Sequence, residues 1–154
     1  MEVGTIMQRE VVTVGGDATI AEVAKVIHER GVGSVIVEEG GRVEGILTER
    51  DVVACVARGM DVHSVKAKEI EKHDLVYASP RTSLEEAARM MVARGIRHLP
   101  VIEDNQLVGI VSMRDLTRWS VTELSTDVGE LPHIELAQKV LLLSHGPGPS
   151  SSSG

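Results

Sequence analysis

The chain has 154 residues, within the range of one compact domain, and 42% of them are hydrophobic, which is enough for a core. Its formal net charge is −7 and its basic residues are scattered, which excludes an electrostatic basis for sequence-independent binding to DNA or RNA. A single cysteine, Cys55, excludes an intramolecular disulfide. No apolar run is long enough to span a bilayer, and the first residues do not form a signal peptide, so we expect a cytoplasmic protein without a membrane partner.

The sequence contains an internal repeat with a shift of 64 residues. Gly45–Asp51 aligns with Gly109–Asp115, and the register continues backwards without a gap until Ile6 falls on Ile70. Apolar positions are kept along this alignment, although the residues themselves often change. A gapless register of this length indicates a duplicated structural unit.

The first copy begins with a predicted strand and a helix. Val11–Val14 is a β-branched run that ends at the turn residues Gly15–Asp17. Thr19 is the predicted N-cap of the helix, with Glu22 as its capping-box partner, and Gly31 is the predicted stop.

A β-hairpin and a second helix complete the first copy. Ser34–Val37 and Val43–Leu47 are predicted strands joined by a turn at Gly40–Gly41. Thr48 then caps a helix that runs through Asp51.

The second copy predicts the same elements. Ser83 caps a helix with Glu86, and Ser112 caps the last helix. The predicted strands and the turn between them are Leu99–Ile102, Asp104–Asn105 and Leu107–Val111.

The order β-α-β-β-α in each copy predicts a fold of the α/β class, of α+β type. One copy buries too little surface to be stable alone, so we expect the two copies to pack sheet against sheet about a pseudo-two-fold axis, with two equivalent clefts. The predicted organisation is repeat 1 at residues 1–64, repeat 2 at 65–120, a linker with a candidate C-terminal helix at 121–145, and a disordered tail at 146–154.

The motif that closes both copies, Gly-hydrophobic-hydrophobic-Thr/Ser-x-x-Asp, resembles the ligand motif of CBS domains. His98–Val101 resembles the second-strand motif of that family, and the resemblance covers about Val3–Trp119. It implies a Bateman module, in which two CBS repeats form one unit that is often a homodimer. It also implies an adenine ligand: AMP, our first choice, or ADP, ATP or S-adenosylmethionine.

Asp51 and Asp115 are the candidate ribose-binding residues. A carboxylate at this place can accept both ribose hydroxyls, while the hydroxyl of Thr48 or Ser112 and the free amides of the first turn face a phosphate or the sugar. The alternative interpretation is structural, because Thr/Ser-x-x-Asp is itself a capping box. The duplication of the motif at the ends of matching strands favours ligand binding.

Basic side chains near these motifs are candidates for phosphate recognition. Arg97 and His98 lie at the start of a strand and either bind a phosphate or are a solvated strand end. Arg50 and Arg114 occupy matching positions, and either reach a phosphate in the opposite cleft or serve as solvated helix residues or intersubunit ion pairs.

The resemblance implies that each cleft combines the two repeats. The cleft of Asp115 would comprise Thr13, Val32, Gly33, Ser34, Arg50, Arg97, His98, Ile110 and Ser112. The cleft of Asp51 would comprise Ile46, Thr48, Tyr77, Ile96 and Arg114. Repeat 1 departs from the motif where it has Gly33–Ile36 against Arg97–Pro100, and Gly16 against Pro80, so we expect two unequal clefts.

No motif for catalysis or for a metal site is present, so we predict a regulatory, energy-sensing module that is not an enzyme. The alternatives are an S-adenosylmethionine sensor, or a ligand-independent module for dimerisation that regulates an unidentified protein. We expect a homodimer, because apolar residues are predicted on the exposed faces of the helices: Val52, Val53, Leu116 and Trp119.

Overall fold

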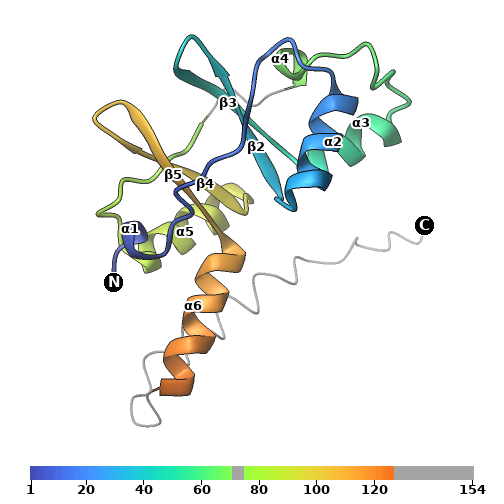
Figure 1. The fold of residues 1–154 in the computed structure, drawn as a ribbon. Coiled ribbons are helices and arrows are strands. Elements are labelled where there is room, and N and C mark those ends of the chain that lie inside the picture. The colour runs from blue at the N-terminus through green and yellow to red at the C-terminus, as the bar shows by residue number, and fades with distance from the viewer. Residues whose placement is uncertain (71–74, 127–154) are drawn as a thin grey trace, which may run out of the picture. The chain divides into compact units, whose positions relative to one another are not determined.

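A computed structural model describes residues 1–70 and 75–126, in two compact units (Figure 1). We call Gln8–Tyr77 with Ile102–Gly109 the repeat-1 unit. We call Met1–Met7, Ala78–Val101 and the chain from Ile110 onward the repeat-2 unit. The remaining parts of the predicted linker, C-terminal helix and tail lie outside the described residues.

The repeat-1 unit is a three-stranded sheet with helices. Its elements are β1 (Thr13–Val14), α2 (Ile20–Arg30), β2 (Ser34–Glu39), β3 (Arg42–Thr48), α3 (Glu49–Ala57) and α4 (Ala67–Ile70). Strand β2 is central, because it pairs in parallel with β1 and in antiparallel with β3. Strand β1 is shorter than predicted: Val12 adds only a hydrogen bond from its carbonyl to the amide of Ile36.

Helix α2 begins and ends where the sequence predicts. Glu22 donates its amide to the Thr19 hydroxyl over 3.2 Å, and its carboxylate accepts from the Thr19 amide over 2.7 Å. Gly31 ends the helix in the left-handed conformation, with φ of 62°. The capping box and the glycine stop are therefore confirmed.

The core of this unit is aliphatic, as the composition requires. Strand β2 lies between two neighbours, so Ser34–Val37 is buried throughout. The buried face of α2 packs against it in a cluster that also contains Cys55; its fully buried apolar members are Ile20, Val23, Val35, Val37, Leu47 and Ala67.

The repeat-2 unit repeats this pattern. Its elements are α1 (Val3–Ile6), α5 (Leu84–Arg94), β4 (His98–Glu103), β5 (Gln106–Ser112) and α6 (Met113–Thr126), with parts of β4 and β5 in the residues grouped with the other unit. Strands β4 and β5 form a two-stranded sheet. Their turn has positive φ at Asp104 and Asn105, which tolerate that conformation. The counterpart of β1 is a single parallel bridge between Ala78 and Val101.

Two expectations about the last helix are wrong. Helix α6 continues to Thr126, so the residues from 121 to 126, which were predicted as linker, are helical. Leu116 is only 2% exposed, because it lies on the inward face of this helix, and it cannot contribute to an exposed apolar surface.

Candidate ligand site

Each unit has a capped junction where a strand runs into a helix. Strand β3 carries Thr48 to the start of α3, and the Oδ2 atom of Asp51 accepts from the Thr48 amide over 2.8 Å and from its hydroxyl over 2.9 Å. The Asp51 amide donates in return to the Thr48 hydroxyl over 3.4 Å. The box holds the carboxylate at the first turn of the helix, half-buried.

The second junction has the same geometry. The Oδ2 atom of Asp115 accepts from the Ser112 amide over 2.8 Å and from the Ser112 hydroxyl over 2.6 Å. The Asp115 amide donates to the Ser112 hydroxyl over 3.3 Å. Two carboxylates 64 residues apart are therefore oriented by the same three contacts.

A backbone hydrogen bond ties each junction to the start of another strand. The amide of Glu49 donates to the carbonyl of Gly33 over 3.1 Å, and the amide of Met113 donates to the carbonyl of Arg97 over 2.9 Å. This contact uses one of the amides that a helix start leaves without an intrahelical partner. We did not predict it from the sequence, although the 64-residue shift relates both of its members.

The junctions gather the predicted residues of each repeat. In the repeat-1 unit, Ser34 pairs with Thr48 in the sheet register, so Gly33 and Ser34 lie beside the box of Asp51. In the repeat-2 unit, Arg97 lies beside the box of Asp115 and is exposed.

Other predicted residues lie farther along the elements. Thr13 pairs with Ile36, two residues beyond Ser34 on β2, and is exposed. Tyr77 precedes the bridge at Ala78 and is also exposed. The remaining apolar candidates are half-buried: Val32, Ile46, Ile96 and Ile110.

The basic candidates differ in accessibility. Arg50 and Arg114 are exposed in the first turns of α3 and α6, while His98, at the start of β4, is half-buried. Arginines in these turns can extend into solvent toward an anion, and their charge needs no compensation by burial of a partner.

The described residues offer little for other chemistry. Within residues 1–70 and 75–126, no group of three or more His, Cys, Asp or Glu side chains could hold a metal ion. Over the same part of the chain, no helix is both long and apolar enough to cross a membrane.

The duplicated strand–helix junctions define a class of paired regulatory modules, and comparison with known proteins names the family. The model of the CBS domain matches this chain twice, over residues 3–58 and 67–122. The chain belongs to the CBS domain family, and its two units are a pair of CBS domains. Members of this family are generally regulatory and lack catalytic activity.

Relatives support this assignment. The chain is 36% identical over 122 residues to the CBS domain-containing protein YhcV of Bacillus subtilis, which covers 79% of this chain and 84% of that protein. It is 38% identical over 119 residues to an uncharacterized protein of Methanopyrus kandleri, which covers 75% of this chain and 61% of that protein. The chain thus spans less than two thirds of the length of this second relative.

Solved structures share the fold. A protein with CBS domains from Burkholderia ambifaria superposes with a TM-score of 0.75 at 27% identity, covering 86% of this chain and 99% of the other. The CBS domain pair of protein MJ0100 has a TM-score of 0.73 at 23% identity, with 80% and 98% covered. That protein was crystallised with 5′-methylthioadenosine and S-adenosyl-L-methionine, so some members of the family bind adenosine-containing ligands.

The capping contacts have a measurable effect on stability. We expect Thr48→Ala and Ser112→Ala each to lower the free energy of unfolding by about 1 kcal/mol, because each variant removes a side-chain acceptor at a helix N-cap. Thr122→Ala is the control: its exposed hydroxyl donates to the Arg118 carbonyl within α6, and its loss should change stability by less than about 0.5 kcal/mol. Urea unfolding measures all three, and unchanged midpoints for both cap variants would contradict the capping role.

Proposed function

We propose that this protein is a regulatory module that binds an adenine nucleotide, with AMP as the favoured ligand and no catalysis of its own. The observation that supports the proposal is the pair of equal junctions, where Asp51 and Asp115 are held at helix starts by identical contacts. A cap alone explains one such box. It does not account for the same carboxylate, with an exposed arginine before it, at both positions.

The chemistry of each junction suits a nucleotide. A carboxylate can accept hydrogen bonds from the two vicinal hydroxyls of a ribose, which distinguishes a nucleoside from most other small metabolites. The start of a helix favours a negative charge through its dipole, and Arg50 or Arg114 adds a cation in the same turn. Arg97 and His98 supply further donors beside the box of Asp115.

The purine needs apolar walls and a close approach to the backbone. By the family resemblance, we assign Val32, Gly33 and Ile110 to the cleft of Asp115, and Ile46, Ile96 and Tyr77 to that of Asp51. Glycine has no side chain, so a flat base can approach the backbone at Gly33. The matching position of repeat 1 in the other cleft is Arg97, whose bulk narrows the space for a base.

Phosphate recognition predicts a preference for AMP over adenosine. Charge-assisted contacts are worth roughly 1.5–3 kcal/mol each, and 1.4 kcal/mol is a factor of ten, so adenosine should bind at least about tenfold more weakly. Calorimetric titration with AMP, ATP, S-adenosylmethionine and adenosine tests this. Arg97→Ala should reduce the preference, while Arg118→Ala, an exposed arginine farther along α6, should not. Equal affinity for AMP and adenosine would show that these cations face solvent.

We infer that the cleft of Asp115 is the tighter of the two. Asp115→Ala removes the acceptor for the ribose hydroxyls and should cost roughly 1–3 kcal/mol of AMP binding, while Asp51→Ala should cost less. Asp115→Asn keeps a side-chain oxygen for the cap and separates folding from binding. If calorimetry with AMP shows that Asp51→Ala abolishes binding and Asp115→Ala leaves it intact, the assignment is reversed.

The second candidate function is a dimerisation module that regulates a partner protein, and it is favoured by the apolar surface of α3. Val53 and Val56 are 65% and 62% exposed one turn apart, whereas Val52 and Trp119 are half-buried. We expect a homodimer that buries this surface, since exposed apolar patches mark interfaces. Sedimentation at micromolar concentration should give twice the chain mass of 16.6 kDa, and Val53→Glu/Val56→Glu should give one chain. A monomeric wild-type protein would exclude the dimer.

A further inference from the structure

Two short segments dock on the two units at equivalent positions. In the repeat-1 unit, the amides of Ala67 and Lys68, at the start of α4, donate to the carbonyls of Ala18 and Gly16 over 2.7 and 3.0 Å. In the repeat-2 unit, the amides of Val3 and Gly4, at the start of α1, donate to the carbonyls of Thr82 and Pro80, each over 2.8 Å. All four pairs of counterparts differ by 64 residues.

Chain order makes this arrangement a problem of specificity. The segment of α1 precedes repeat 1 in the sequence but docks on the repeat-2 unit, while the segment of α4 follows repeat 1 and docks on the repeat-1 unit. Both segments use the same backbone contacts, including an antiparallel bridge, Glu2 to Ser83 or Lys66 to Thr19. Backbone hydrogen bonds therefore cannot distinguish the correct partner, and side chains must do so.

The first distinguishing feature is steric. In the repeat-2 unit, Gly4 faces Pro80, and a Cβ atom on Gly4 would lie 3.1 Å from both the Cβ and the carbonyl oxygen of Pro80. In the repeat-1 unit the sizes are reversed: Gly16 faces Lys68, and a Cβ atom on Gly16 would lie 3.2 Å from the Cβ of Lys68. Each docked pair thus contains one glycine, and it is on opposite sides in the two units.

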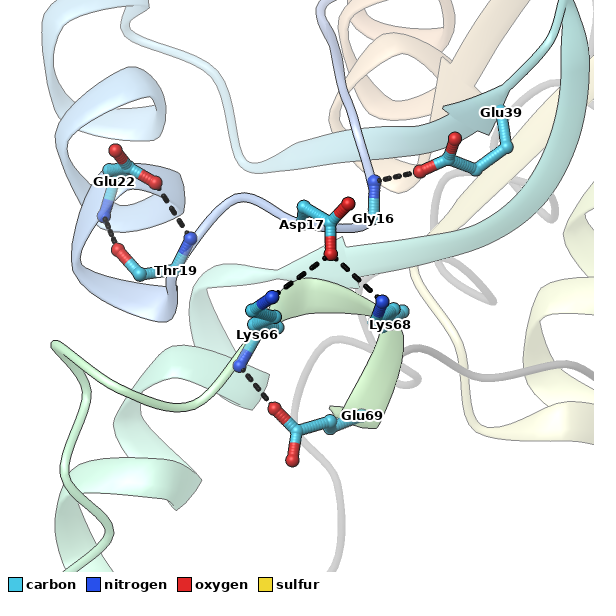
Figure 2. A network of polar contacts seen from close by, with 8 residues as sticks. All are labelled: Gly16, Asp17, Thr19, Glu22, Glu39, Lys66, Lys68 and Glu69. Atoms are coloured by element: carbon cyan, nitrogen blue, oxygen red, sulfur yellow. Dashed lines mark hydrogen bonds and ion pairs between the residues drawn. The ribbon is translucent and has the colours of Figure 1, made fainter.

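The second feature is charge. Figure 2 shows the Oδ1 atom of Asp17 between Lys66 and Lys68, whose Nζ atoms lie 3.1 and 2.8 Å away. Hydrogen bonds from Lys68 and then Lys66 lower the pKa of Asp17, so its carboxylate is charged at neutral pH. In the repeat-2 unit the counterpart of Asp17 is Arg81, and the counterpart of Lys66 is Glu2. The signs are exchanged between surface and segment.

A third contact fixes the identity of Gly16. Its amide donates to the Oε1 atom of Glu39 over 2.7 Å (Figure 2). Proline, which stands at the matching position 80, has no amide hydrogen and could not make this bond. A Cβ atom on residue 16 would also lie 2.8 Å from the same carboxylate oxygen. The surface of repeat 1 is therefore built for a glycine, and that of repeat 2 accepts a proline.

We propose that these exchanged sizes and charges form a recognition code that assigns each segment to its own repeat and prevents the two from docking on the wrong one. The segment of α4 on the repeat-2 surface would bring Lys68 against Pro80 and Lys66 toward Arg81. The segment of α1 on the repeat-1 surface would leave a gap between two glycines and bring Glu2 toward Asp17. Both wrong pairings lose packing and place like charges together.

The test transfers the code from one segment to the other. Glu2→Lys/Gly4→Lys gives the first segment the side chains of the second, and Pro80→Gly/Arg81→Asp gives the repeat-2 surface those of repeat 1. Hydrogen exchange of the Val3 amide, followed by NMR, reports local opening of this contact. The Ala67 amide, in the unchanged unit, is the internal control. Thr5→Glu, an exposed change in the same segment, controls for added charge.

We expect the segment variant to exchange at the Val3 amide at least about tenfold faster than the wild type, because the clash and the like charges favour opening. Combining it with the surface variant should restore exchange to within about threefold of the wild type, although each pair is disruptive alone. Gly4→Ala, with and without Pro80→Gly, isolates the steric part.

The combination decides the outcome even if the segment variant fails to fold. Recovery of a folded protein with slow exchange at Val3 supports the code. Exchange that stays fast in the combined variant, or unchanged exchange in the segment variant, shows that the side chains do not select the docking partner and overturns the proposal.

Discussion

A carboxylate that accepts hydrogen bonds from the last residue of a strand governs each half of this protein. Asp51 and Asp115 satisfy amides at the start of α3 and α6, and the backbone bonds from Glu49 and Met113 connect the same junctions to a neighbouring strand start. Donors at helix starts have no intrahelical partners, so this arrangement supplies them without water. It also holds an acidic side chain, a hydroxyl and a helix start at one place, which is the combination a nucleotide requires.

The aliphatic core makes these junctions rigid. Strand β2 is buried between β1 and β3, and its position determines where Gly33 and Ser34 meet Thr48. Because the core has no large aromatic side chains to fill space, close packing depends on many small contacts among β-branched residues. The predicted ligand residues lie at the edge of this packing, where side chains change from buried to exposed.

Duplication provides two such junctions and also creates the risk of wrong pairing. Two homologous surfaces accept two homologous segments through the same backbone bonds, so the sequence must break the symmetry. Gly4 with Pro80 and Gly16 with Lys68 do so by size, and Asp17 with its two lysines does so by charge. Exposed ion pairs contribute little to stability, but a like-charge contact still penalises the alternative. Divergence between the repeats therefore serves folding as well as ligand preference.

The sequence by itself determined the repeat, the secondary structure and the capping boxes, because these depend on contacts between residues at most a few positions apart. Thr19 with Glu22, Thr48 with Asp51 and the glycine stop at Gly31 are of this kind. Tertiary structure decided what depends on distant residues: the burial of Leu116, the shortness of β1, and the docking of Val3 and Gly4 on residues 80–82. Local patterns carry no information on which surface an apolar residue or a short segment will meet, since that choice is made by packing between parts of the chain far apart in sequence.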